Sequence, residues 1–361
     1  MTELHERLAA RIAREGPLTV AEYMAACLGD PTHGYYRAGE RLGAQGDFIT
    51  APEASQIFGE LIGAWAATMW AALGRPQPCR LIELGPGRGV LMSDALRLAA
   101  SVAPDFAAAI DLHLVEINVT LRARQAERLA AAKPCWHLDL ATVPAGPLII
   151  IANEFFDALP IRQFQRQPDG WHERLIGLAE DDRRLTFMLG PALASPPIPA
   201  RHRAAPIDDI VEIGEAAATL IAAIADRILR DGGVALIVDY GPPPGALGDS
   251  LQAVRGHQRR DPLAAPGEAD LSAHVDFESL AEAASAAGLG VFGPLPQGLW
   301  LTRLGLFQRA AALMKRASAA EAMAIEAACR RLVHPTEMGG MFRLVAVTRT
   351  GLEPPPGFAP P

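Results

Sequence analysis

The sequence predicts an α/β fold built on a mostly parallel sheet. Three observations support this: short continuous apolar runs, helical segments of about a dozen residues between them, and a Gly-rich exit from the first run. Continuous apolar runs are typical of strands buried on both faces of a parallel sheet. Strands separated by helices form right-handed crossovers. An N-terminal helical module and an inserted antiparallel meander with lid loops are expected to complete the chain.

Length and composition limit the kind of protein. The 361 residues include 33 Lys and Arg against 41 Asp and Glu, which gives a formal net charge of −8, and half of them are hydrophobic. This apolar content predicts a folded chain. The acidic balance argues against nucleic acid and membrane surfaces as partners. The longest apolar stretch, 61–73, is shorter than the ~20 residues that cross a bilayer, so no membrane insertion is expected.

The first 75 residues are expected to form a helical lid module. Residues 2–27 predict two helices, and Thr19 and Glu22 have the spacing of a capping box at the start of the second. Apolar residues spaced by three and four predict a further helix over 55–73. The module thus consists of helices joined by turn-rich loops.

The core is expected over residues 76–350, where strands and helices alternate. The predicted strands are 79–84, 110–116, 147–152, 234–239 and 342–348, and the predicted helices are 90–102, 119–132, 215–230, 276–287, 301–314 and 318–331. Insertions are expected at about 160–205 and 240–275. The first contains three short strands separated by turn residues, which predict an antiparallel meander, and the second is expected to be a long loop. Residues 351–361 are expected to form a flexible tail.

The segment after the first predicted strand indicates a binding site. Gly85, Gly87 and Gly89 follow this strand and precede a helix, which brings bare backbone and helix N–H groups close to a ligand. A dinucleotide clamp needs its third glycine three positions after the second, where this chain has Val90. The carboxylate of Glu83 would repel a pyrophosphate but suits an ammonium group. A plain tight turn is the alternative interpretation.

Two further acids are expected at the same edge of the sheet. Glu116 ends the second predicted strand, where a carboxylate accepts hydrogen bonds from a ribose diol; a helix N-terminal acid is the alternative. Asp139 follows residues 135–138, one strand further out, where an adenine amino group can donate to it; a solvated acid is the alternative. Together with Glu83 and the glycines, these acids match an S-adenosylmethionine site better than a nucleotide phosphate site.

The methyl acceptor is expected at the end of the third predicted strand. Asn153, Glu154 and Asp157 follow the apolar run 148–152, at the edge that faces the transferable methyl group. Glu154 and Asp157 would hold a guanidinium through paired hydrogen bonds, and Asn153 could instead orient a neutral nitrogen. These three are the candidate catalytic residues. In the alternative interpretation, Asn153 caps a following helix and Asp157 is solvated.

The chain closely resembles the MidA-like family of class I methyltransferases, whose mitochondrial members are complex I assembly-factor protein arginine methyltransferases. The matching blocks are 46–55, 58–60, 83–89, 153–160, 239–241, 251–254 with His257, 266–271, 274–277 and 338–339. The resemblance implies a Rossmann-like class I fold, S-adenosylmethionine held by Gly85, Gly87, Gly89 and Glu116, and a protein arginine as acceptor. In the mitochondrial relatives this arginine lies in the 49-kilodalton-type subunit of NADH dehydrogenase.

The resemblance also suggests a role for two polar loops, 43–53 and 241–276. We expect them to fold over the cofactor and line an arginine-accepting channel. The candidate channel residues are Asp47, Glu53, Tyr240, His257, Asp270 and His274. In the alternative interpretation, the two histidines only bind loop backbone and Asp47 belongs to a simple turn. His274 and Asp276 lack a third ligand nearby, so no metal site is expected.

Three functions therefore compete. The favoured one is an S-adenosylmethionine-dependent protein arginine methyltransferase that acts on a respiratory complex I subunit. The alternatives are an assembly chaperone that binds the cofactor without turnover and a nicotinamide-dependent oxidoreductase, which Val90 and Glu83 disfavour. Because no mitochondrial leader precedes the first predicted helix, a bacterial cytoplasmic enzyme is expected.

Overall fold

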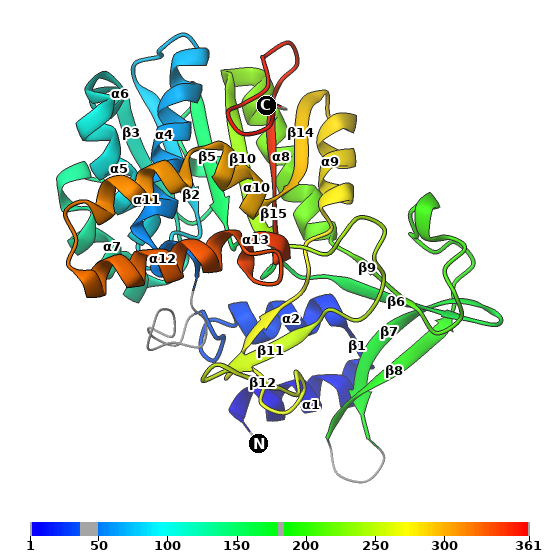
Figure 1. The fold of residues 1–361 in the computed structure, drawn as a ribbon. Helices are drawn as coiled ribbons and strands as arrows, with labels where there is room; N and C mark the ends of the chain where they lie inside the picture. Colours follow the sequence, from blue (N-terminus) through cyan, green and yellow to red (C-terminus); the bar gives the residue numbers. More distant parts are fainter. Residues whose placement is uncertain (1, 37–49, 180–183, 360–361) are drawn as a thin grey trace.

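A seven-stranded sheet forms the centre of the molecule in the computed structural model, which describes residues 2–36, 50–179 and 184–359 (Figure 1). Its order is β14-β15-β10-β5-β2-β3-β4. The strands are β2 (Cys79–Leu84), β3 (Ile110–Val115), β4 (Cys135–His137), β5 (Leu148–Asn153), β10 (Gly233–Tyr240), β14 (Leu289–Pro296) and β15 (Phe342–Arg349). Neighbours from β10 to β4 pair in parallel, whereas β15 is antiparallel to both of its neighbours. The predicted mostly parallel sheet is confirmed.

The order of the strands reverses at β2. β3 and β4 follow on one side of β2, and β5 and β10 lie on the other. In the register of the sheet, Leu84 is paired with Val115 of β3 and with Ala152 of β5. The glycine loop, Glu116 and Asn153 therefore leave the sheet at the same edge, where open α/β sheets bind their ligands.

Helices cover both faces of this sheet. One face packs against α4 (Gln56–Ala72), α5 (Val90–Val102), α6 (Pro104–Ala109), α10 (Gln297–Arg303), α11 (Leu306–Met314), α12 (Ala319–Val333) and α13 (Met338–Met341). The other packs against α8 (Glu215–Asp231) and α9 (Phe277–Ala286). In β5, Ile149 and Ile151 point to the first face, and Leu148 and Ile150 to the second. This two-sided burial explains the continuous apolar run.

A second, antiparallel sheet lies beside the central unit (Figure 1). Its strands are β1 (Leu18–Thr19), β6 (Arg162–Gln167), β7 (Gly170–Leu178), β8 (Leu185–Ala192) and β9 (Ile210–Ile213). The predicted meander corresponds to β6, β7 and β8. α1 (Glu3–Glu15) and α2 (Val20–Gly29) pack against it in a shared hydrophobic cluster. The predicted capping box is present: the Thr19 hydroxyl accepts from the Glu22 N–H at 3.1 Å, and Glu22 accepts from the Thr19 N–H at 2.9 Å.

The described helices of the first 75 residues belong to two different hydrophobic clusters. α1 and α2 share a cluster with β7 and with residues 251–273, whereas α4 packs into the core beneath the central sheet. α4 can approach α5 closely because it carries glycines there: a Cβ at Gly63 would lie 2.5 Å from the carbonyl oxygen of Ala95. The division into a lid module, a core, insertions and a tail stays a prediction.

Several segments differ from the expected elements. Within 240–274, expected as a loop, three strands form a small antiparallel sheet: β11 (Gln252–Arg255), β12 (Gln258–Arg260) and β13 (Asp270–Ser272). The predicted helix 301–314 is divided into α10 and α11 at Gly305, whose φ is 91°. The expected flexible tail contacts α10, since the Trp300 indole N–H donates to the Pro356 carbonyl at 3.2 Å.

Candidate active site

A cavity of about 400 Å³ opens where β2, β3 and β5 end. Most of its lining comes from the glycine loop with Glu83, the end of β3, the turn after β5 and the N-terminal part of the chain, and Leu91, Leu121 and Leu138 complete it. The N-terminal lining residues are Met24, Ala25, Leu28, Gly29, Tyr36, Thr50, Pro52 and Glu53. Both the glycine loop and α2 thus contribute to the cavity wall.

The glycine loop has the backbone that its sequence requires. Gly85, Gly87 and Gly89 have φ values of 62°, 52° and 73°, a left-handed conformation that residues with a Cβ rarely adopt. A Cβ at Gly85 would also lie 2.6 Å from the Phe155 ring. α5 begins directly after Gly89, so its first N–H groups lie at this edge of the sheet.

Glu83 brings a buried carboxyl group to the floor of this cavity. It is 3% exposed, and its Oε2 has no hydrogen-bond partner in the described part of the chain. Burial, and then the neighbouring Glu116, raise the pKa of Glu83 to about 8. A buried acceptor without a donor is costly, and the ammonium of a methionyl group would supply one. The site therefore fits the cationic end of S-adenosylmethionine.

Glu116 is fixed in place by two donors. Its Oε1 accepts from the Asn118 N–H at 2.8 Å and its Oε2 from the Gln125 side chain at 3.2 Å. Burial raises the pKa of Glu116, against the lowering effect of these hydrogen bonds. Each oxygen retains acceptor capacity for a ribose hydroxyl. The geometry thus suits the predicted contact with a ribose.

Gln125 is a polar residue of this site that no sequence pattern singles out. It lies on α7 (Val119–Arg128) and is fully buried. Besides Glu116, its amide donates to the Gly87 carbonyl at 2.7 Å, and its carbonyl accepts from the Trp136 indole at 2.8 Å. One side chain therefore connects the glycine loop, the end of β3 and β4. A single polar residue inside a helix gives no sequence signal of such a role.

Asp139 lies at the margin of the site. It is exposed, it does not line the cavity, and its Oδ1 accepts from the Ala141 N–H at 2.9 Å. Its neighbour Leu138 lines the cavity and is 64% exposed. The structure thus brings the loop, although not the carboxylate, to the cavity wall.

Asn153 and Glu154 line the same cavity, at the end of β5. Glu154 Oε1 accepts from the Ala51 N–H at 2.9 Å and from the Asn153 amide at 3.0 Å. Burial raises the pKa of Glu154 to about 7, and its φ of 52° is a strained value for a residue other than glycine. The Oδ1 of Asn153 is buried and has no partner in the described chain. The alternative in which Asn153 caps a helix is wrong, because the residues after it form a turn.

Asp157 is held behind this turn by Asp239. Oδ2 of Asp239 accepts the N–H groups of Phe155, Phe156 and Asp157 at 3.0, 2.8 and 3.2 Å. Burial, Asp239, Asp270 and Glu154 raise the pKa of Asp157 well above its usual value. Asp157 does not line the cavity, although it is near enough to Glu154 for that carboxyl group to affect its pKa. Asp239 ends a predicted strand, and no sequence pattern indicates its role in holding this turn.

The expected channel residues are dispersed. Glu53 lines the cavity, and Asp270 accepts from the hydroxyl of Tyr36, which lines it too, at 2.9 Å. His257 is exposed in the turn between β11 and β12, away from the cavity. Asp47 lies outside the described residues.

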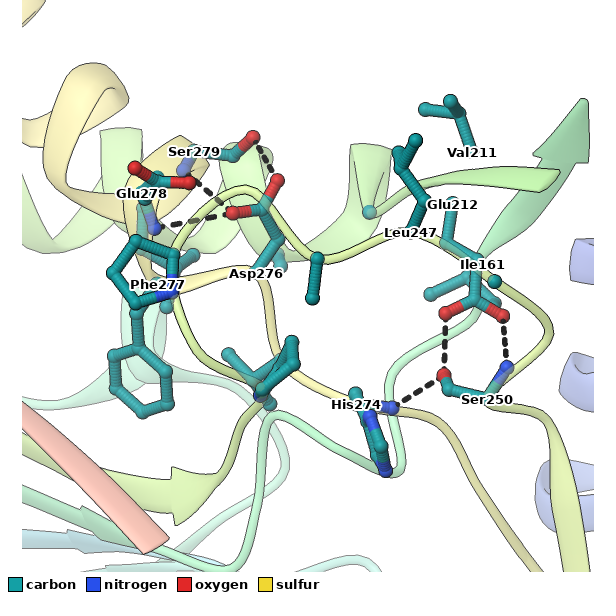
Figure 2. Close-up of a pocket in the computed structure, with 18 of the residues that line it drawn as sticks. Ile161, Val211, Glu212, Leu247, Ser250, His274, Asp276, Phe277, Glu278 and Ser279 are labelled. Atoms are coloured by element: carbon teal, nitrogen blue, oxygen red, sulfur yellow. Dashed lines mark hydrogen bonds between the residues drawn. The ribbon is translucent and has the colours of Figure 1, made fainter. Parts of the chain in front are cut away.

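The rings of Tyr240 and His274 are in contact, with centroids 4.6 Å apart and ring planes tilted by 58°. His274 lines a second cavity, of about 180 Å³, shown in Figure 2. There its N–H donates to the Ser250 hydroxyl, and Asp276 caps α9 by accepting from the Glu278 and Ser279 N–H groups. Among the described residues, no three His, Cys, Asp or Glu side chains are grouped as metal ligands would be. The absence of a metal stays a prediction.

The strand order, the glycine loop after β2 and the acid after β3 define a methyltransferase of the class that uses S-adenosylmethionine. The model of a family of S-adenosyl-L-methionine-dependent methyltransferases matches residues 61–295, and the chain belongs to this family. The expected enzyme class, fold and cofactor are confirmed. Within the described chain, no helix has both the length and the apolar content needed to cross a bilayer.

Relatives of known name extend over nearly the whole chain. The protein arginine methyltransferase NDUFAF7 of Danio rerio is 37% identical, over 96% of this chain and 86% of its own length. The Drosophila melanogaster homologue is 36% identical, over 95% and 84%, and the human protein is 34% identical, over 96% and 83%. All three are described as mitochondrial.

Solved structures agree with these relatives. A Burkholderia thailandensis protein with S-adenosyl-homocysteine bound matches with a TM-score of 0.83 and 26% identity, over 98% of this chain and 93% of its own. A second structure from that organism gives a TM-score of 0.81 and 27% identity, over 99% and 94%. The similarity therefore includes the N-terminal helices and the antiparallel sheet as well as the core.

Proposed function

We propose that this methyltransferase modifies an arginine side chain of a protein. The observation that carries the proposal is the combination of apolar and acceptor groups in the cavity lining. Apolar residues of α2, including Met24 and Leu28, line it. Glu154 and Asn153 line it too, and the Oδ1 of Asn153 is an acceptor with no partner among the described residues. A cavity that combines apolar lining with such acceptors suits a side chain with an aliphatic stem and a cationic, multiply donating head.

In this proposal, different lining residues bind different parts of the cofactor. Glu83 takes the ammonium of the cofactor, the glycine loop approaches its methionyl part, and Glu116 takes the ribose. Leu138 and Asp139 lie at the margin where the adenine would end. When bound, the cofactor would supply the electrophilic methyl group. The protein then contributes alignment and electrostatics, which is all that a direct displacement requires.

Glu154 and Asn153 hold the attacking nitrogen. The Glu154 carboxylate restrains the guanidinium through charge-assisted hydrogen bonds, and Asn153 Oδ1 accepts a further N–H. As the nitrogen gains the methyl group it must lose a proton, and Glu154 Oε can accept it because burial raises its pKa to about 7. Ala51 donates to Oε1 and keeps this carboxylate in position. Asp157, which lies behind the turn, has no direct contact in this scheme.

The acceptor protein is proposed from the relatives. The curated relatives are named protein arginine methyltransferases, and the family resemblance implies a 49-kilodalton-type subunit of the respiratory NADH dehydrogenase as the acceptor. An acidic chain, with a net charge of −8, would attract an arginine-bearing segment of such a subunit. A bacterial cytoplasmic setting belongs to the same proposal.

The substitution Glu154→Gln tests the acceptor assignment. We expect it to lower kcat by at least about 100-fold, because one group holds the guanidinium and takes its proton. S-adenosyl-homocysteine affinity, measured by calorimetry, should stay within about two-fold, since the hydrogen bonds of Glu154 are to Ala51 and Asn153 and not to Glu83 or Glu116. Glu268→Gln is the matched control, because Glu268 is exposed on an ion pair with Arg255 and does not line the cavity.

A cofactor-binding chaperone without turnover is the competing function. It predicts that Glu154→Gln restores complex assembly as well as the wild type does. Retained assembly with retained cofactor binding would therefore contradict a catalytic role. Loss of both methylation and assembly, with cofactor binding intact, supports catalysis.

A further inference from the structure

One cation lies among the acids of the main cavity. Glu53, Glu83, Glu116 and Glu154 line it, and Arg88 is the only Lys, Arg or His among its described lining residues. The methionyl end of S-adenosylmethionine carries a carboxylate as well as an ammonium. A cavity with four carboxyl groups would repel that carboxylate unless a cation were paired with it.

We propose that Arg88 is the counter-ion of the cofactor's carboxylate. Arg88 lies in the glycine loop between Gly87 and Gly89, directly before α5, and its side chain is 34% exposed. Its planar guanidinium binds carboxylates through paired donors. The N-terminal end of α5 adds positive partial charge at the same place. Glu83 would then pair with the ammonium of the cofactor's amino-acid group, and Arg88 with its carboxylate. This assignment rests on the proposed position of the cofactor.

Glu53 has a place in this arrangement. Nη1 of Arg88 lies 3.6 Å from Oε1 of Glu53, which is longer than the about 2.7–2.9 Å of a charge-assisted hydrogen bond. The other oxygen of Glu53 is buried and has no partner in the described chain. Both residues line the cavity, where a ligand carboxylate would approach the guanidinium more closely than Glu53 does. Glu53 is a positioning residue for Arg88.

If Arg88 has this role, its loss should weaken the binding only of ligands that carry the carboxylate, an effect that neither Glu83 nor the glycine loop would produce. A ligand that keeps the adenosine, the sulfur and the amine but lacks the carboxylate should not depend on Arg88. S-adenosyl-homocysteine should depend on it strongly. Decarboxylated S-adenosyl-homocysteine, a thioether with a terminal propylamine, is therefore the matched ligand.

The experiment compares both ligands by titration calorimetry on the full chain. Arg88→Met should weaken S-adenosyl-homocysteine binding by about 10–100-fold, the usual effect of losing a hydrogen bond to a charged group. The Kd of the decarboxylated ligand should change by less than about two-fold. Arg88→Lys should recover part of the loss, because it keeps the charge but not the fork. Arg124→Met is the control, since Arg124 is 57% exposed on α7 and does not line the cavity.

Equal losses for the two ligands, or no loss for either, would overturn the role of Arg88. If a thermal melt shows that Arg88→Met is unfolded, Arg88→Lys tests the role of Arg88 instead. The measurement is again the ratio of the affinities for S-adenosyl-homocysteine and for the decarboxylated ligand. A wild-type chain that binds neither ligand would instead contradict the position of the cofactor, and the role of Arg88 with it. The two failures are thus distinguishable.

Discussion

Buried carboxyl groups determine how the cavity responds to pH. Burial, together with Glu116, raises the pKa of Glu83 to about 8, and burial raises the pKa of Glu154 to about 7. Both groups are therefore largely protonated at pH 6 and become charged as the pH rises toward 8. The charged form of Glu83 is the one that pairs with an ammonium, so cofactor binding and ionisation of Glu83 are linked.

Affinity for S-adenosyl-homocysteine should increase from pH 6 to pH 8. Because Glu83 must lose its proton to pair with the ligand, we expect Kd to fall by about ten-fold or more and a proton to be released. Calorimetry in buffers of different ionisation enthalpy measures both. Glu83→Gln should bind weakly and with little pH dependence. A steep pH dependence that survives in Glu83→Gln would exclude Glu83 as its source.

The same raised pKa affects the stability of the free protein. When folding raises the pKa of a carboxyl group, the group contributes its full stabilisation at pH values below its pKa in the unfolded state. This contribution is lost as the pH rises through its pKa in the folded state. Without ligand, Glu83→Gln should therefore be more stable than the wild type at pH 8 and equally stable near pH 4. Urea denaturation at the two pH values measures the difference.

Gln125 should affect the cofactor through Glu116 and the glycine loop. Gln125→Leu keeps the volume but removes the contacts to Gly87, Glu116 and Trp136. We expect about a ten-fold loss of S-adenosyl-homocysteine affinity. In a double-mutant cycle with Glu116→Gln the losses should be less than additive, because the two side chains act as a unit. Additive losses would show that Gln125 acts independently of Glu116.

Residues at predicted strand ends can be found from the sequence, whereas residues that act through tertiary contacts cannot. Glu83, Glu116 and Glu154 follow or end apolar runs, and parallel strands bring such ends together. Gln125 and Asp239 act by contacting the ends of other elements, which no local pattern records. Asp157 has the expected residue type, but it does not line the cavity and its backbone N–H donates to Asp239.

At the scale of elements, α4 and α5 are held together by close backbone contact. A Cβ at Gly63 would lie 2.5 Å from the oxygen and 2.7 Å from the Cα of Ala95, and a Cβ at Gly59 would lie 2.8 Å from the oxygen of Leu91. These atoms are backbone and cannot move aside. The pair α4–α5 thus explains why α4 belongs with the core even though it lies in the first 75 residues.

Gly63→Ala should destabilise the protein. Overpacking at a helix contact costs about 1–3 kcal/mol, which urea denaturation would detect as a lower midpoint with an unchanged slope. The control is Gly29→Ala, because Gly29 ends α2 and a Cβ added there would have no described atom within 4 Å. An unchanged midpoint for Gly63→Ala would contradict the close contact.

The elements that the sequence does not reveal have local reasons. β14 contains Gly290, Gly293 and two prolines, which disfavour strands, but it lies at the edge of the sheet where they are tolerated. β11, β12 and β13 have only four, three and three residues, too few for a periodic pattern. Long, strongly periodic elements such as α4, and continuous apolar strands such as β5, are predicted closely.

At the scale of the molecule, parts remote in the sequence enclose the cavity. α2 lines the cavity, β1 pairs with β7 of the antiparallel sheet, and the Tyr23 hydroxyl donates to the Pro262 carbonyl at 2.6 Å. The N-terminal helices, the meander and residues 251–273 thus form one support on that side (Figure 1). A fixed wall of this kind suits a large acceptor that inserts one side chain, as the proposed arginine would.

Mass spectrometry of methylarginine tests the central claim most directly. The proteome of a strain that lacks the gene would be compared with its parent, and with strains that carry the wild-type or Glu154→Gln gene. We predict that at least one methylarginine site disappears in the deletion, returns with the wild type and does not return with Glu154→Gln. An unchanged set of methylarginine sites across the four strains would contradict a protein arginine methyltransferase.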